Sequence, residues 1–191
     1  MKYCLWLAGE GTGELLSLLD EEDRVFLRTL HRGKAAEDSY LTQALMKQAA
    51  RELGFSGVRI RRSEKGAPIS EEAGLFLSGT HTGGCCAAAA SHHPIGIDAQ
   101  GIAPAREAVV RRFFLPEERR FLDSQPRRDE AFTLLWTMKE AYGKMTGLGL
   151  AAARPVAFYQ EDGQLRCADP SVRLFTRRQG VIILSIVESL S

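Results

Sequence analysis

Residues 136–147 read WTMKEAYGKMTG and place one carboxylate, Glu140, between two lysines, Lys139 and Lys144. In a helix that advances about 100° per residue, these three side chains and Trp136 fall within an arc of roughly 140°. One face of the helix would then present an acid and two ammonium groups. Lysines suit phosphate oxygens, and a glutamate suits a metal ion or a proton. We therefore predict a phosphate-handling helix, with a solvated lysine and glutamate stripe as the alternative.

A second motif lies some forty residues upstream, where residues 94–100 read PIGIDAQ. The alternation of apolar residues predicts a strand that carries Gly96, Asp98 and Gln100 on one face. Glycine leaves room for another group to approach the backbone, and the two longer side chains offer oxygen ligands. Because Mg²⁺ takes one or two carboxylates and fills its shell with water and phosphate oxygens, we predict that Asp98 and Glu140 are two halves of a metal site. Gln100 would be a weak third ligand, directly or through a water, and a strand-end aspartate is the alternative for Asp98.

Two further segments carry polar or basic residues near glycines. Residues 77–84 read LSGTHTGG and predict a turn whose backbone amides, together with Thr80 and His81, hold a phosphate. A hairpin loop with an incidental histidine is the alternative. Residues 62–68 read RSEKGAP and supply Arg62 and Lys65 ahead of a glycine and proline turn.

Taken in this order, the motifs resemble those of the Sfp-type 4′-phosphopantetheinyl transferases of the holo-[acyl-carrier-protein] synthase superfamily. That family carries Gly-Lys-Pro, then Phe-Asn-x-Ser-His-Ser, then Gly-[Ile/Val]-Asp-x-Glu, then Trp-[Ser/Thr]-x-Lys-Glu-[Ala/Ser]-x-x-Lys-x-x-Gly-x-Gly-Leu. Residues 112–118, RFFLPEE, also resemble the family's Phe-x-Pro-x-Glu segment between the last two motifs. The resemblance covers roughly residues 58 to 150.

The resemblance implies a fold and a reaction. The expected fold is α+β, with two similar lobes in a pseudo-twofold arrangement and coenzyme A in the cleft between them, so that a monomer is self-sufficient. The expected reaction transfers 4′-phosphopantetheine from coenzyme A to a serine of an apo acyl or peptidyl carrier protein, with Mg²⁺, and releases adenosine 3′,5′-bisphosphate.

The resemblance also implies roles for particular residues. Asp98 and Glu140 would hold Mg²⁺, and Glu140, directly or through a water, would be the base for the serine proton. Lys139 and Lys144 would neutralise the pyrophosphate. Thr80 and His81 would contact the 3′-phosphate of coenzyme A, and Arg62 and Lys65 would belong to a basic loop around its adenosine end.

Three departures from the family pattern bear on function. Gln100 stands where many members have a third carboxylate, Ala67 replaces the lysine of Gly-Lys-Pro, and residues 78–80 lack the asparagine. We expect weaker binding of Mg²⁺ and coenzyme A rather than loss of activity. The alternatives are a degenerate homologue that binds coenzyme A or carrier proteins without turnover, and another Mg²⁺-dependent phosphotransferase.

Composition sets further bounds. The chain has 191 residues, 45% hydrophobic content and a formal net charge of +1, so no global field points to nucleic acid or membrane. An acidic carrier protein would need a local basic patch, which the arginines at 111, 112, 119 and 120 could form, with a solvated helix face as the alternative. Residues 1–8 contain an apolar run too short for a signal peptide, and four cysteines show no metal-ligand spacing. We therefore expect a reduced, cytoplasmic protein.

Periodicity predicts two halves, residues 1–94 and 95–191, with strands and helices segregated as in α+β proteins. Helices are predicted at residues 21–30, 37–53, 105–113, 116–122 and 128–145. Strands are predicted at residues 2–8, 58–62, 75–78, 85–91, 95–99, 155–160, 164–168, 173–176 and 181–188, with a hairpin turn at 161–163.

Overall fold

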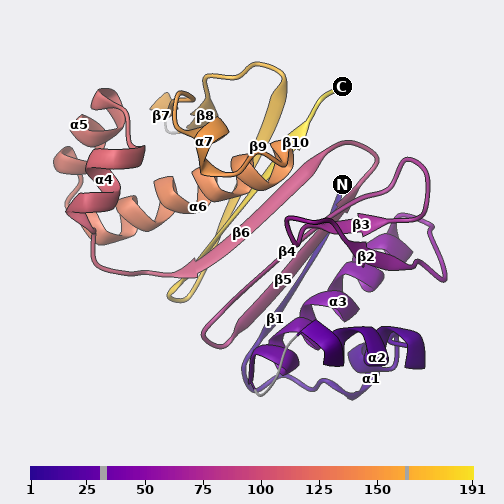
Figure 1. The fold of residues 1–191 in the computed structure, drawn as a ribbon. Helices are drawn as coiled ribbons and strands as arrows, with labels where there is room; N and C mark the ends of the chain where they lie inside the picture. Colours follow the sequence, from indigo (N-terminus) through magenta and orange to yellow (C-terminus); the bar gives the residue numbers. More distant parts are fainter. Residues whose placement is uncertain (31–33, 162–163) are drawn as a thin grey trace. The chain divides into compact units, whose positions relative to one another are not determined.

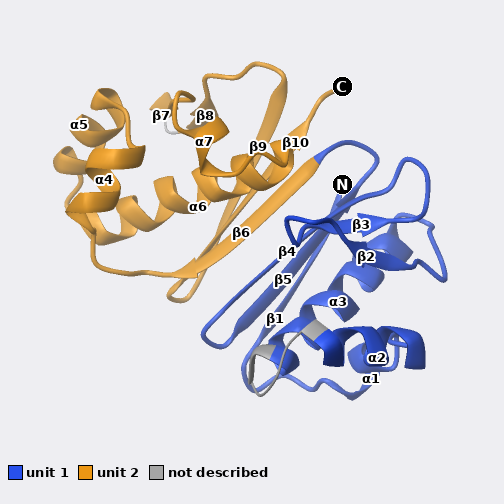
Figure 2. Cartoon of the chain, in the orientation of Figure 1, with its two compact units in different colours: residues 1–94 blue, residues 95–191 orange. Residues whose placement is uncertain are grey.

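The computed structural model describes residues 1–30, 34–161 and 164–191 (Figure 1). The chain forms two compact units, Met1–Pro94 and Ile95–Ser191 (Figure 2). Each unit is described by itself below.

The first unit is built on a three-stranded antiparallel sheet of order β1-β5-β4, against which helix α3 packs. The central strand consists of small residues that are buried along its whole length, and α3 packs against it. Gly79 of β4 lets the helix approach closely, since a Cβ there would lie 2.5 Å from Thr42 Cγ2. The elements of this unit are β1 (Lys2–Leu7), α1 (Gly13–Leu16), α2 (Glu21–Leu30), α3 (Lys34–Glu52), β2 (Ile60–Arg62), β3 (Pro68–Ser70), β4 (Phe76–Thr82) and β5 (Cys85–Ser91).

The second unit repeats this plan with different side chains. Its antiparallel sheet has the order β6-β10-β9, and helix α6 packs against it, with α5 beside the helix (Figure 1). In both units the first strand of the sheet and the long helix precede the other two strands of the sheet, and the last strand lies in its middle. The elements are β6 (Ile95–Gly101), α4 (Glu107–Phe113), α5 (Pro116–Ser124), α6 (Arg128–Thr146), α7 (Leu150–Ala153), β7 (Phe158–Glu161), β8 (Gln164–Cys167), β9 (Val172–Gln179) and β10 (Ile182–Ser189).

The predicted α+β class is confirmed, and most predicted elements are present. The prediction of a turn around residues 78–82 is wrong, and this difference bears on function. These residues belong to strand β4, and the reversal of the chain falls at Gly83 and Gly84, where Gly84 has a φ of +81°. The predicted turn at 161–163 lies partly outside the described residues.

Two further observations concern the cysteines and the helices. All four cysteines are free thiols, and burial raises the pKa of Cys85 and Cys86 to about 11. Within the described ranges, no helix is long and apolar enough to cross a bilayer.

Candidate functional site

Helix α6 lies directly on strand β6 because of a glycine. A Cβ at Gly96 would lie 1.9 Å from the carbonyl oxygen of Ala141 and 2.6 Å from the backbone nitrogen of Met145. The space above Gly96, predicted to admit a ligand, is therefore filled by the helix backbone. This close approach brings the residues of the two predicted motifs together.

Asp98 and Lys144 form the centre of this arrangement. The Nζ of Lys144 donates hydrogen bonds to Asp98 Oδ1 at 2.8 Å and to the carbonyl oxygen of Ile97 at 3.0 Å. Asp98 is only 8% exposed, whereas Lys144 remains open to solvent. A buried carboxylate with a mobile ammonium group on its exposed side is suited to exchange that cation for another.

Glu140 lies one helical turn before Lys144 and is half-buried. Burial raises the pKa of Glu140, the nearby Asp98 carboxylate raises it further, and Lys144 lowers it. The two carboxylates thus lie near enough to repel each other, and a cation between them would relieve that repulsion. Gln100 follows on the same face of β6 as Asp98 and is also half-buried.

This donor set fits Mg²⁺. The ion accepts one or two carboxylates with water and phosphate oxygens, so it does not need a larger cage of protein ligands. Among the described residues, no group of three or more histidine, cysteine, aspartate or glutamate side chains is arranged to hold a metal.

The prediction that Lys139 binds coenzyme A is wrong in this structure. Its side chain is fully buried in the second unit, and its Nζ lies 3.0 Å from Glu118 Oε1. The same Nζ donates to the carbonyl oxygens of Ala153 at 3.1 Å and Val156 at 3.0 Å, which uses all three protons of the ammonium group. Burial lowers the pKa of Lys139, and Glu118 opposes that shift.

Glu118 has a role in this region that the sequence motifs do not predict. It is fully buried, its Oε1 accepts the backbone N–H of Phe158 at 2.9 Å, and its Oε2 accepts that of Leu115 at 2.8 Å. A glutamate at the third position of a helix often accepts the backbone N–H of the residue just before the helix. The spacing of Leu115 and Glu118 is therefore a sequence signal for the hydrogen bond between them.

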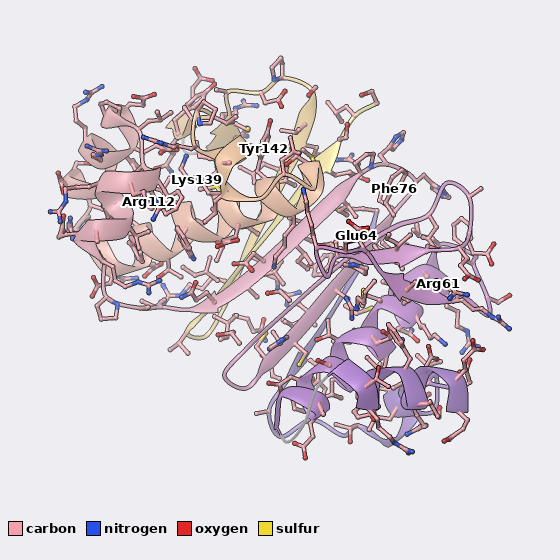
Figure 3. All side chains as sticks on the ribbon, in the orientation of Figure 1. Arg61, Glu64, Phe76, Arg112, Lys139 and Tyr142 are labelled. Atoms are coloured by element: carbon pink, nitrogen blue, oxygen red, sulfur yellow. The ribbon has the colours of Figure 1, made fainter. Side chains whose placement is uncertain are left out.

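In the first unit, two of the predicted coenzyme A ligands line one cavity. The cavity has a volume of about 490 Å³ and contains both Arg62 and His81. His81 Nδ1 lies 3.7 Å from Asp38 Oδ2, and burial lowers the pKa of Arg62. The cavity is lined by Ser39, Thr42, Arg62, Ser63, Glu64, Gly66, Gly79 and His81, of which Glu64 is labelled in Figure 3.

Thr80 and Lys65 are placed differently. Thr80 is buried and alternates with His81 along β4, so its side chain leaves the opposite face of the strand and does not line this cavity. The backbone of this segment pairs with β5, with His81 opposite Cys86, so the predicted phosphate-binding turn of exposed amides is also wrong. Lys65 is exposed and precedes Gly66, and it is not among the residues that line the cavity.

The predicted basic patch on α4 and α5 is only partly available. Arg119 donates to the carbonyl oxygens of Phe114 at 2.9 Å and Arg111 at 2.7 Å, which joins the two helices. The guanidinium of Arg112 lies 5.2 Å from the centre of the Phe113 ring (Figure 3). Arg111, Arg112 and Arg120 are exposed.

Comparison with known proteins bears on the unit that holds Asp98, Glu140 and Lys144. Residues 94–182 match the sequence model of the 4′-phosphopantetheinyl transferase superfamily. The second unit of this chain is therefore similar in sequence to that superfamily. The matched residues include both predicted metal ligands and the whole of α6.

The curated relatives of this chain are bacterial enzymes. The chain is 36% identical over 104 residues to the 4′-phosphopantetheinyl transferase psf-1 of Bacillus pumilus, an alignment that covers 52% of this chain and 45% of that protein. It is 28% identical over 151 residues to the 4′-phosphopantetheinyl transferase ffp of Bacillus subtilis, covering 76% of this chain and 67% of that protein. The resemblance to Sfp-type enzymes is thereby confirmed.

Two qualifications accompany these matches. The chain spans less than half of the length of the Bacillus pumilus relative. Among solved structures, the holo-[acyl-carrier-protein] synthase of Thermotoga maritima aligns with 49% of this chain and 61% of its own, with a TM-score of 0.43 and 21% identity, which is too distant to add to the sequence matches.

Proposed function

We propose that this protein transfers the 4′-phosphopantetheine group from coenzyme A to a serine of an apo carrier protein. One observation carries the proposal: the segment that matches the superfamily brings Asp98 and Lys144 within 2.8 Å of each other, with Glu140 on the same helix. The relatives bear the name of this activity.

The residues of this site divide the reaction between them. The serine Oγ attacks the phosphorus on the pantetheine side of the pyrophosphate, a new P–O bond forms, and the bond to adenosine 3′,5′-bisphosphate breaks. Glu140 accepts the serine proton, for which its raised pKa suits it. Lys144 moves from Asp98 to a pyrophosphate oxygen and neutralises charge there.

Asp98 and Glu140 would hold Mg²⁺, with Gln100 contributing an oxygen directly or through a water. The ion would neutralise charge on the pyrophosphate oxygens. Because an amide replaces a third carboxylate at Gln100, we expect weaker binding of the ion than in relatives with three acids.

The cavity of the first unit contains N–H donors that suit a phosphate group of coenzyme A. Arg62 and His81 would bind the 3′-phosphate, since a guanidinium recognises phosphate through a fork of N–H donors. Lys65, exposed next to the turn at Gly66, would act as a nearby point charge.

The test is intact-mass spectrometry of a panel of apo carrier proteins after incubation with this protein, coenzyme A and Mg²⁺. A phosphopantetheine-sized gain on one or more carriers, absent with Glu140→Gln, would support the proposal. No gain on any carrier, with the protein folded and coenzyme A intact, would contradict it.

A second candidate function is binding of coenzyme A or carrier proteins without turnover, which Gln100 and Ala67 motivate. Ala67 is exposed, and its backbone N–H donates to Ser63 Oγ at 3.0 Å, so a lysine fits there without disturbing the turn. The variant Gln100→Glu, Ala67→Lys separates the two readings. A wild type that binds coenzyme A but transfers nothing, with transfer gained by the variant, would indicate a degenerate homologue.

A further inference from the structure

The ion pair between Lys139 and Glu118 lies beside the proposed catalytic residues without being one of them. Both side chains are fully buried, with 3.0 Å between Lys139 Nζ and Glu118 Oε1. Lys139 immediately precedes Glu140 in α6, so any rotation or shift of the helix at one residue is transmitted to the other.

This pair holds the backbone of three segments. Lys139 donates hydrogen bonds to the carbonyl oxygens of Ala153, at the end of α7, and Val156, in the turn that follows it. Glu118 accepts hydrogen bonds from the N–H groups of Phe158, at the start of β7, and Leu115, before α5. The ring of Phe158 also lies 5.4 Å from Lys139 Nζ. Two charged side chains therefore satisfy four backbone groups and connect α5, α6, α7 and β7.

The opposite side of α6 carries the contacts that matter for chemistry. There the helix backbone rests on Gly96, and Lys144 reaches Asp98 and Ile97. Elsewhere along its length the helix packs through apolar residues such as Phe132, Leu135 and Met138, which are fully buried. Apolar contacts are not directional, so they allow small rotations of a helix that hydrogen bonds with fixed partners do not.

We propose that Lys139 and Glu118 are positioning residues, which fix the rotation of α6 about its axis and so set Glu140 and Lys144 relative to Asp98. This inference rests on the proposed transfer reaction. A buried ion pair seldom adds net stability compared with neutral residues of similar volume, whereas its directional bonds can specify one arrangement among several. The pair explains why a lysine with no access to substrate stands next to the proposed base.

The experiment compares Lys139→Met, Glu118→Gln and the double variant with the wild type. Lys139→Met leaves a buried carboxylate without its cation, and we expect its melting temperature to fall by about 10 °C. Adding Glu118→Gln removes that charge and keeps an acceptor for one backbone N–H, so the double variant recovers most of the loss. Its kcat with coenzyme A and carrier protein nevertheless stays about 100-fold below the wild-type value, because the reacting groups remain misplaced, while KM for coenzyme A changes less than about threefold.

A second readout does not depend on activity. Hydrogen–deuterium exchange of peptides that cover residues 136–156 is expected to be faster in the double variant than in the wild type, even though its melting temperature is restored. The control is Lys47→Met with Asp23→Asn, which removes a buried ion pair in the first unit and should alter stability without changing kcat or exchange in α6.

Two results would overturn the proposal. If the double variant regains both wild-type kcat and wild-type exchange, the pair only contributes to stability. If Lys139→Met raises KM for coenzyme A by tenfold or more without lowering the melting temperature, Lys139 touches the substrate. A wild type without transfer activity would contradict the proposed function instead, and in that case the exchange measurement alone decides whether the pair fixes α6.

Discussion

Neighbouring residues in α6 have different surroundings: Lys139 is fully buried, and Glu140 is half-buried beside Asp98. The two residues are separated by about 100° around the helix and, with Lys144, lie within an arc of roughly 140°. In the structure that arc spans a boundary, with Lys139 in the core and Lys144 exposed. The pairing of Asp98 with Lys144 agrees with the predicted proximity of the two motifs. Which lysine faces the core depended on Glu118, which no helical periodicity connects to α6.

Glu140 is expected to be essential for transfer. Glu140→Gln keeps the size of the side chain and removes the proton acceptor, so kcat should fall by about 100-fold or more. Steady-state kinetics with a carrier protein identified by mass spectrometry measures this. The matched control is Glu130→Gln, which removes a charge from the same helix at a residue that pairs with Arg178 at 2.7 Å, and should leave kcat unchanged. Equal losses in the two variants would mean that helix charge, not the base, limits the rate.

The same substitution should increase stability near neutral pH. Because burial raises the pKa of Glu140, its ionised form is less favourable in the folded than in the unfolded protein. The carboxylic acid therefore contributes stability below its ordinary pKa of 4.5, and this contribution is lost as the pH rises through the raised value. In a buffer with EDTA, Glu140→Gln should melt at a higher temperature than the wild type near neutral pH, with the difference vanishing below pH 4.5. A variant that melts lower at neutral pH would contradict this.

At the level of secondary structure, the long periodic elements and several short strands were predictable, and the four-residue helices were not. The predicted helix at 128–145 is observed at Arg128–Thr146. It was predictable because buried residues recur along its whole length. Helices α1 and α7 have four residues each and were missed, since they contain too few turns for a repeat to show. Strand β4 was predicted to stop at residue 78 because Gly79 signals a turn, but that glycine serves close packing against Thr42.

Gly96 should be intolerant of any side chain. Gly96→Ala places a Cβ against the backbone of Ala141 and Met145, neither of which can move without displacing α6 from β6. We expect a loss of at least about 3 kcal/mol in the free energy of unfolding, the upper part of the range for overpacked cores. Gly101→Ala on the same strand is the control, since its Cβ would meet only Ile182 Cδ1 at 4.0 Å. Urea denaturation compares the two, and equal stability of both variants would show that α6 does not rest on Gly96.

The contact between Asp169 and α6 predicts a pH-dependent contribution to stability. Asp169 accepts hydrogen bonds from the Ser171 hydroxyl at 2.6 Å and from Tyr142 at 2.7 Å, and these bonds lower its pKa below the ordinary 3.8. The carboxylate therefore adds stability above pH 3.8 that is lost as the pH falls through the lowered value. Because the carboxylate is partly open to solvent, Asp169→Asn should cost less than about 1 kcal/mol.

Urea denaturation of Asp169→Asn near neutral pH and near pH 3 measures this contribution. The deficit of the variant should be present at neutral pH and smaller in acid. Tyr142→Phe, which removes one donor to the same carboxylate, should show part of the same deficit. A deficit that grows in acid would mean that the protonated form of Asp169 is the one the fold stabilises.

For the whole molecule, the two units share one order of strands but carry different chemistry. The second unit combines the acids Asp98 and Glu140 with Lys144, and the first unit has a cavity that contains Arg62 and His81. The sequence predicts that the two halves contain similar sets of helices and strands. It does not predict their shared order of strands within a sheet, because the two halves have no common sequence motif. The distribution of acids and cations followed directly from the motifs.

This division predicts that the two units affect different kinetic constants. Removing a charged donor to a phosphate costs about 1.5 to 3 kcal/mol, so Arg62→Ala and His81→Ala should each raise KM for coenzyme A by about tenfold or more and leave kcat nearly unchanged. With dephospho-coenzyme A, which lacks the 3′-phosphate, both variants should match the wild type. The control is Arg59→Ala, which changes an exposed arginine just before β2, the strand that contains Arg62. This variant should change neither KM nor kcat. An equal rise in KM for both substrates would place Arg62 and His81 against another part of coenzyme A, and a fall in kcat alone would assign the first-unit residues to the chemical step.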